Sequence, residues 1–335
     1  MVNFKYFWGF KNCANIVKNF VLAILLTLLL IPASLVGQKK SNLGPYTMFE
    51  QMIFPQKQER ILSYLADDCA RGRSVGTLAH QNIGKYIRDH FEQYGLKPFQ
   101  GHYYQHFMCD SVKVGRNVVG FIPSIIPSDK YVIISAHYDH IGALNGFVYN
   151  GADDNASGVT ALLNLAEMFG SMHKAKMGPD KNIIFVAFDA KEMSMAGSRH
   201  FVKNLDIPKE KIICNINMDQ IGSTLEPVHE GISDYLIILG ENTLAKEHRG
   251  KLGICNRFYN INLDIDYTFY SSKAFTELYY KLSDQVAFEE AGIPALLLTS
   301  GFHKHTYKIT DDLNIISYPA LKKRSVLVFY FVMML

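Results

Sequence analysis

Two hydrophobic patterns follow one another along the chain. In residues 56–98, apolar side chains recur at every third or fourth position, which predicts helices, the second of them closed by Gly95. From residue 117 the pattern changes to short apolar runs, and residues 117–122 and 131–135 predict two strands. The helical faces are formed by Ile61, Leu62, Tyr64 and Leu65 and by Ile83, Tyr86, Ile87, His90, Phe91 and Tyr94.

Beyond these two strands, predicted helices and strands alternate. The alternation predicts an α/β fold, a three-layer α/β/α arrangement with a mixed, mainly parallel central sheet. Sheets of this kind bind ligands at the carboxyl ends of their strands. The further predicted strands are 182–188, 212–218, 235–239 and 295–299, and the further predicted helices are 158–169, 194–204, 288–291 and 319–334.

The first 37 residues differ from the rest of the chain. They carry Lys5, Lys11 and Lys18 and no acidic residue, and the apolar run 20–31 is followed by small residues. This layout is typical of a secretory signal, so we expect residues 1–37 to be removed and residues 38–335 to form a single periplasmic or secreted domain. The alternative is an uncleaved anchor, because an apolar segment of this length is at the lower limit for spanning a bilayer.

The net charge and the cysteines limit the possible partners and compartment. The whole chain has a formal charge of +3, and the three lysines of the predicted signal account for all of it. We therefore expect no nucleic-acid partner and, after signal cleavage, no stable association with a membrane. In an oxidising compartment the remaining cysteines form one or two disulfides or stay as free, buried thiols; they are Cys69, Cys109, Cys214 and Cys255.

Two clusters of polar residues in the first half of the chain suggest a metal site. His137 follows the strand 131–135, and Asp139 lies where its carboxylate can accept the imidazole proton and orient the other ring nitrogen toward a metal. Asp153 and Asp154, flanked by glycines, open the helix that begins at residue 158. One acid would be enough to cap that helix, and one aspartate can bridge two cations, so we favour metal binding over capping.

Further acidic and histidine residues follow the later strands. A single such residue is as well explained by a helix cap or a local hydrogen bond, but strand ends of a parallel sheet converge on one edge. The sequence therefore predicts a shared metal site there. The residues are Asp189, Lys191 and Glu192 after strand 182–188, Asp219 at the end of strand 212–218, and His303 and His305 after strand 295–299.

With these motifs the chain resembles the family-28 zinc metallopeptidases, which include secreted bacterial aminopeptidases, glutamate carboxypeptidases and the related glutaminyl cyclases. The resemblance covers nearly the whole mature chain and implies a zinc-exopeptidase fold and a peptide substrate. Beyond the metal motifs it rests on Val75-Gly76-Thr77, Tyr94-Gly95-Leu96, Asn117-Val118-Val119, Ala196-Gly197-Ser198, Ser283-Asp284 with Phe288, and Gly292-Ile293-Pro294.

The resemblance also implies a site with two zinc ions. Asp139 would orient a histidine ligand, and the peptide bond after Asp154 is typically cis in relatives. In this assignment His137 and Asp219 hold one zinc, Glu192 and His305 hold the other, and Asp154 bridges the two.

One position departs from the family pattern. Lys191 stands where the resemblance implies a general-base glutamate. A charged lysine accepts no proton, so three interpretations stay open: slow hydrolysis, a Lys191 that works as an uncharged base, or a substitute carboxylate such as Asp189.

These observations together predict an exported aminopeptidase that hydrolyses N-terminal peptide bonds with water activated by two zinc ions. The alternatives are a glutaminyl cyclase-like enzyme and a catalytically impaired metal-binding homologue, the second favoured by Lys191. An aromatic stretch either lines a side-chain pocket or packs in the core. Its residues are Tyr267, Phe269, Tyr270, Tyr279 and Tyr280.

Overall fold

The computed structural model describes residues 46–335. The predicted signal, residues 1–37, lies outside the described residues. The strands are β1 Lys97–Pro98, β2 Tyr104–Met108, β3 Val114–Ile122, β4 Tyr131–His137, β5 Gly142–Leu144, β6 Phe147–Tyr149, β7 Asn182–Phe188, β8 Ile212–Met218, β9 Tyr235–Leu239, β10 Asp264–Asp266 and β11 Ala295–Thr299. The helices are α2 Thr47–Glu50, α3 Pro55–Leu65, α4 Leu78–Tyr94, α5 Gly158–Lys174, α6 Ala196–Lys203, α7 Lys251–Phe258, α8 Lys273–Tyr279, α9 Gln285–Glu290 and α10 Tyr318–Met334.

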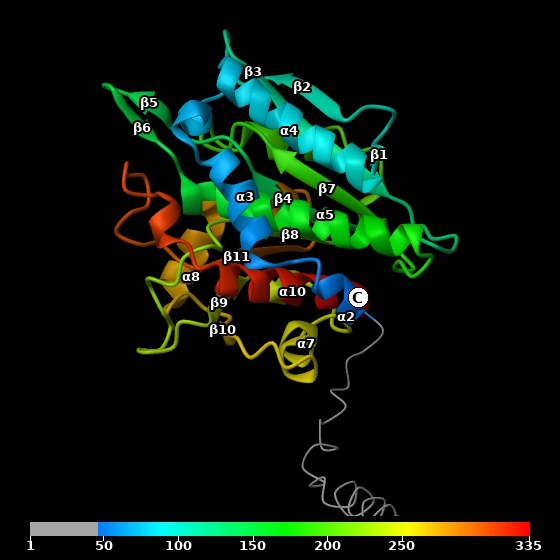
Figure 1. Ribbon diagram of the computed structural model, residues 1–335. Helices are drawn as coiled ribbons and strands as arrows, with labels where there is room; N and C mark the ends of the chain where they lie inside the picture. Colours follow the sequence, from blue (N-terminus) through cyan, green and yellow to red (C-terminus); the bar gives the residue numbers. More distant parts are fainter. Residues whose placement is uncertain (1–45) are drawn as a thin grey trace, which may run out of the picture. The chain divides into compact units, whose positions relative to one another are not determined.

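Nine strands of residues 46–335 form the central sheet (Figure 1). Their order is β1-β3-β7-β4-β8-β11-β9-β10, and β2 pairs with β3 at one edge. The central strands β7, β4, β8 and β11 run parallel, whereas β3 is antiparallel to β7 and β9 is antiparallel to β11. The predicted mixed sheet with a parallel centre is therefore confirmed.

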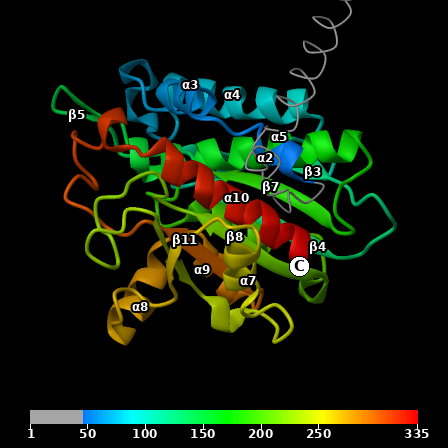
Figure 2. The same ribbon diagram turned by 60° about the horizontal axis from the view of Figure 1, so that its bottom comes forward.

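Alternate residues of the central strands pack into two separate cores. In β4, Val132 and Ile134 belong to one core and Ile133 to the other. The first core also contains residues of α3, α4, α5 and α10, and Figure 2 shows α4 and α5 together on one side of the sheet. Phe201 of α6 and Phe288 of α9 close the second core. Because strand side chains alternate between the two faces of a sheet, both faces are covered and the three layers follow.

Local sequence sets several element boundaries. Thr77 caps α4, its hydroxyl accepting a hydrogen bond from the backbone N–H of His80 at 3.2 Å, and Gly95 ends the helix with φ of 88°. Strands β7, β8, β9 and β11 have the bounds predicted from their apolar runs. Every residue of β7, β9 and β11 is buried, which is why the runs are continuous rather than alternating.

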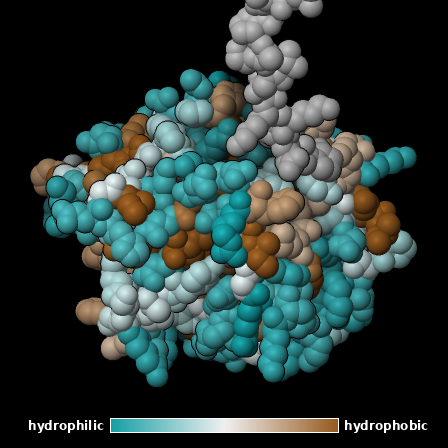
Figure 3. All heavy atoms as spheres, turned by 90° about the horizontal axis from the view of Figure 1, so that it is seen from below, coloured by the Kyte–Doolittle hydropathy of each residue, from teal (hydrophilic) through white to brown (hydrophobic). Residues whose placement is uncertain are grey.

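Several other expectations concern the surface and the cysteines. Within the described chain no helix has both the length and the apolar character needed to cross a membrane. On the face drawn in Figure 3, hydrophobic side chains form small groups separated by hydrophilic ones. The four cysteines of residues 46–335 are free thiols, but only Cys214 and Cys255 are buried, since Cys69 is exposed and Cys109 is half-buried. The interpretation as free, buried thiols therefore holds for two of them.

Candidate metal centre

The carboxyl ends of β4, β7 and β8 bring most of the predicted ligands to one edge of the sheet. His137 is the last residue of β4 and pairs in register with Phe188, the last residue of β7. Glu192 follows β7 after a short turn, and Asp219 follows β8 directly. Because these three strands are parallel neighbours, the residues after them lie side by side.

Four of the five predicted ligands come together at this edge. His137 Nε2 lies 3.3 Å from Asp219 Oδ1 and 3.4 Å from Asp154 Oδ1. Ligand atoms of His137, Asp154 and Glu192 all lie within 4.8 Å of one another. The side chains of His137 and Asp154 are fully buried, whereas that of Glu192 is 22% exposed. An imidazole and carboxylates at such distances form a donor set that suits zinc.

Asp139 connects the histidine ligand to the turn that carries Glu192. Its backbone carbonyl lies 3.2 Å from His137 Nδ1, and its carboxylate oxygen Oδ1 lies 3.6 Å from the same nitrogen. The carboxylate also accepts hydrogen bonds from the backbone N–H groups of Lys191 at 3.0 Å and Glu192 at 3.1 Å. Burial alone would raise the pKa of Asp139, but these bonds and His137 lower it. Asp139 therefore has the position of an orienting residue.

The loop before α5 fixes Asp154 relative to β8. The backbone N–H of Asp154 donates to Asp311 Oδ2 at 3.0 Å. The Asn155 side chain donates to the carbonyl of Met218 at 2.9 Å and accepts from the backbone N–H of Gln220 at 3.1 Å. The Asp154–Asn155 peptide bond is cis, as the family resemblance implies.

Two adjacent aspartates of this loop have different environments. Asp153 Oδ1 accepts hydrogen bonds from the backbone N–H groups of Gly222 at 2.6 Å and Ser223 at 3.2 Å. Both carboxylate oxygens of Asp154 are buried, and neither has a hydrogen-bond partner among residues 46–335. A buried carboxylate without a hydrogen bond is costly unless cations lie close enough to balance its charge. The residues present thus fit a metal ion, and Asp154 is the side chain that fits it most clearly.

Lys191 reaches into the middle of this group. Its Nζ lies 3.2 Å from Glu192 Oε1, 3.9 Å from Asp219 Oδ2 and 4.0 Å from Asp154 Oδ1, and its side chain is only 5% exposed. Burial alone would lower the pKa of Lys191, but the surrounding carboxylates outweigh burial and hold that pKa well above its usual range. Lys191 is therefore a charged ammonium in this arrangement and has no capacity to accept a proton.

The structure does not bring His305 to the other predicted ligands. Its side chain is partly exposed, and Nδ1 lies 2.9 Å from the hydroxyl oxygen of Thr310. Among the described residues, no carboxylate pairs with His305. The neighbouring His303 is buried and lies 3.0 Å from Asp153 Oδ2, and its other ring nitrogen lies 3.2 Å from the backbone nitrogen of His305.

His140 is a site residue that the sequence analysis did not single out. It is 2% exposed, its Nδ1 lies 4.0 Å from Glu192 Oε1, and neither ring nitrogen has a hydrogen-bond partner within the described chain. Burial lowers the pKa of His140 to about 3, so the ring is neutral. Burial likewise raises the pKa of Glu192 to about 7. The signal available in the sequence was the position of His140 directly after Asp139.

Two cavities differ in what lines them. A cavity of about 190 Å³ beside the ligand group is lined by Lys191 and Asp219 together with the aromatic rings of Tyr279, Phe302 and Tyr307. In the aromatic stretch, Phe269 is buried and stacks on Tyr279 with ring centres 4.1 Å apart. Phe269 thus packs in the core, whereas Tyr279 lines the cavity, so each interpretation of the stretch holds for part of it.

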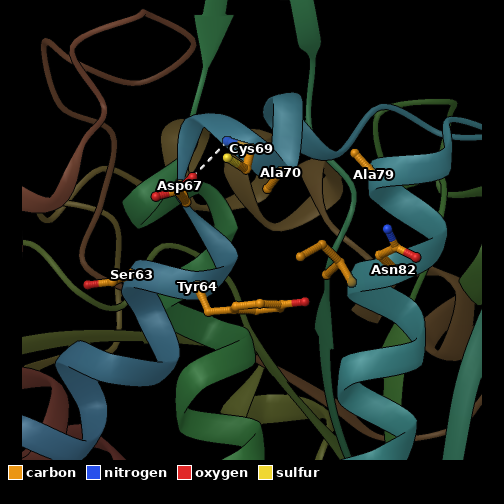
Figure 4. Close-up of a pocket in the computed structure, with 8 residues that line it drawn as sticks. Ser63, Tyr64, Asp67, Cys69, Ala70, Ala79 and Asn82 are labelled. Carbon is orange, nitrogen blue, oxygen red and sulfur yellow. Dashed lines mark hydrogen bonds between the residues drawn. The ribbon is translucent and has the colours of Figure 1, made fainter.

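The second cavity, of about 470 Å³, lies between α3 and α4 (Figure 4). Tyr64 of α3, Cys69 of the connecting segment and Asn82 of α4 line it, and none of the predicted site residues does. Of these two cavities, only the smaller one borders the candidate metal ligands.

Comparison with models of protein families identifies the family of this chain. The model of peptidase family M28 matches residues 117–332, which is more than half of the chain. The chain belongs to peptidase family M28.

Curated M28-like relatives match over limited stretches. Aminopeptidase YwaD of Bacillus subtilis is 30% identical over 122 residues, which is 35% of this chain and 24% of YwaD. The glutamate carboxypeptidase 2 homologue of Caenorhabditis briggsae is 32% identical over 108 residues, which is 32% of this chain and 13% of that protein. The chain thus spans less than a quarter of the length of these relatives in the matched regions.

Solved structures show the same fold over most of the chain. The zinc aminopeptidase BSAP of Bacillus subtilis superposes with a TM-score of 0.65 at 15% identity, covering 84% of this chain and 94% of that one. The glutaminyl cyclase of Porphyromonas gingivalis superposes with a TM-score of 0.62 at 18% identity, covering 84% and 98%. The M28 fold therefore carries both aminopeptidases and glutaminyl cyclases, and the function of this chain must be argued from its own site.

Proposed function

We propose that this M28 protein is an exported, zinc-dependent exopeptidase that removes amino-terminal residues from peptides. The observation that carries the proposal is the grouping of His137, Asp154, Asp219 and Glu192, with both oxygens of Asp154 buried and without a hydrogen bond among residues 46–335. Zinc bound by these residues would polarise the scissile carbonyl and lower the pKa of water.

The chain's own residues supply binding and orientation. Asp139 holds the His137 ring and the turn of Glu192 in place through the contacts at 3.0 to 3.6 Å described above. The cavity lined by Tyr279, Phe302 and Tyr307 offers an apolar wall beside the ligands, which suits a hydrophobic side chain of the substrate. Lys191 stands in the general-base position as an ammonium, so we expect turnover to lack about 10²–10⁴-fold of general-base assistance.

The test uses the purified mature protein and a panel of aminoacyl amides. We expect slow release of the amino acid, loss of activity after removal of metal by a chelator, and recovery on adding Zn²⁺. The matched control is the same panel with acetylated amino groups, which an aminopeptidase leaves intact. Cyclisation of an amino-terminal glutamine without amide hydrolysis would instead identify a glutaminyl cyclase. Activity that survives complete metal removal would contradict the proposal.

Export is proposed from the basic and apolar character of residues 1–37. We expect the protein isolated from its native cells to begin near Gln38 and to occur outside the cytoplasm. Amino-terminal sequencing of cell fractions measures both. Full-length protein in the cytoplasmic fraction alone would contradict export, and full-length protein in the membrane fraction would identify an anchor.

A further inference from the structure

The ammonium of Lys191 lies among the same three carboxylates that the family resemblance assigns to two metal ions. Its Nζ is 3.2 Å from Glu192 and 4.0 Å or less from Asp154 and Asp219. We propose that this ammonium takes the place of one of the two cations, so that the mature chain binds a single zinc ion. The inference rests on the zinc dependence proposed above and concerns the number of ions.

The remaining ligands of a second ion are incomplete in this structure. The resemblance assigns the second zinc to Glu192 and His305. Lys191 makes its shortest carboxylate contact with Glu192, while the His305 ring is partly exposed and bonded to Thr310. Glu192 is therefore paired with Lys191, and His305 lies apart from the carboxylates.

The charges of these side chains also indicate a single bound zinc ion. Asp154, Glu192 and Asp219 contribute three negative charges when ionised, and the Lys191 ammonium neutralises one of them. One divalent ion balances the remaining two charges of this group, whereas a second ion would add two positive charges that these three carboxylates do not balance. Buried charge without a counter-charge is strongly unfavourable, so the lysine and a second zinc compete for the same carboxylates.

Other contacts hold the ammonium where it is. Its Nζ donates a hydrogen bond to the hydroxyl of Tyr307 at 3.2 Å and lies 5.6 Å from the centre of that ring. The backbone N–H of Lys191 is bound to Asp139 Oδ1 at 3.0 Å. Hydrogen bonds thus hold both the backbone N–H and the ammonium of Lys191. The side chain therefore has a defined position in the site and does not extend into solvent.

The ligands left for the single ion are those around His137. Its Nε2 faces Asp154 and Asp219 at 3.4 and 3.3 Å, and neither Asp154 oxygen has a hydrogen bond among residues 46–335. Glu192 remains within reach, since its ligand atoms lie within 4.8 Å of those of His137 and Asp154. The proposed ion is thus held by His137 and Asp154, with the flanking carboxylates completing the set.

The experiment counts zinc ions per chain. Wild-type mature protein and the variants Lys191→Met and Lys191→Arg are stripped with a chelator, saturated with Zn²⁺, separated from free metal by gel filtration and analysed for zinc. We expect one ion in wild type and in Lys191→Arg, which keeps the positive charge, and two in Lys191→Met, which removes it at similar volume. The matched control is Lys181→Met, because Lys181 is also buried but lies at the opposite end of β7, and we expect one ion there.

The outcomes separate the two proposals. Two ions in wild type would overturn the inference and leave zinc dependence intact, while no ion in wild type would overturn zinc dependence itself. One ion in every variant would also overturn the inference, because Lys191 would then not set the number. Circular dichroism shows whether Lys191→Met folds. If it does not, the wild-type protein is loaded with Co²⁺ and studied by electron paramagnetic resonance. A signal of two coupled ions would contradict the inference, and a signal of an isolated ion would support it.

Discussion

Replacing Asp154 with asparagine is expected to lower zinc affinity by roughly a hundredfold or more and to remove metal-dependent hydrolysis. Changes to residues that merely orient metal ligands cost about 10–100-fold in affinity, and Asp154 is a proposed ligand itself. Both of its carboxylate oxygens are buried and lack a hydrogen bond among residues 46–335, so the substitution removes a charge that a bound cation would neutralise. Asparagine has nearly the same shape, which limits any change in packing. Isothermal titration with Zn²⁺ measures the affinity.

The adjacent acid supplies a matched control for this variant. The carboxylate of Asp153 is occupied by the backbone N–H groups of Gly222 and Ser223 and by His303. We expect Asp153→Asn to lower stability while the number of bound ions stays as in wild type. Equal zinc affinity in wild type and Asp154→Asn would remove the central argument for the site.

Arg73→Met is expected to lower the free energy of unfolding by about 3–5 kcal/mol, the usual cost of breaking a buried charged network. Arg73 is 1% exposed. Its guanidinium donates hydrogen bonds to five backbone carbonyls, those of Leu65, Tyr138, Asn150, Gly151 and Asp154. Burial lowers the pKa of Arg73 to about 10, against the opposing effect of Asp154, so the side chain stays charged at neutral pH. Methionine fills much of the volume but leaves all five carbonyls without their donor.

Denaturant unfolding of the metal-free protein measures this effect without interference from zinc. Arg73→Lys keeps the charge but has no planar fork, so we expect it to recover only a minor part of the loss. The control is Arg199→Met, since Arg199 pairs with Glu290 at the surface with 45% of its side chain exposed, and a change within about 1 kcal/mol is expected. A loss below about 1 kcal/mol for Arg73→Met would contradict the assigned role.

The central strands and the main helices were predictable because their patterns are strong. Strand β7 is buried along its whole length, and only an unbroken apolar run satisfies both faces of a covered parallel sheet. Strand β10 and helix α8 were missed, since each is short and carries few buried side chains. Short, exposed elements leave little periodicity in a sequence.

Some residues of the candidate site and its surroundings were predictable from the sequence, and others were not. His137, Asp154, Glu192 and Asp219 were predictable because strand ends of a parallel sheet converge and because their spacing resembles that of M28 peptidases. Arg73 was not, because an arginine is usually a surface residue and only the fold shows the five backbone carbonyls that this one contacts.

The sequence alone determined the α/β class, the parallel centre of the sheet and the edge at which the ligands gather, since these follow from residue periodicity and local order. The tertiary structure decided what those residues contact. It placed Lys191 within 4.0 Å of three carboxylates and left His305 bonded to Thr310 instead. The contacts of Lys191 with Asp154 and Asp219 depend on how segments more than 25 residues apart pack together, and neither spacing nor composition encodes them directly.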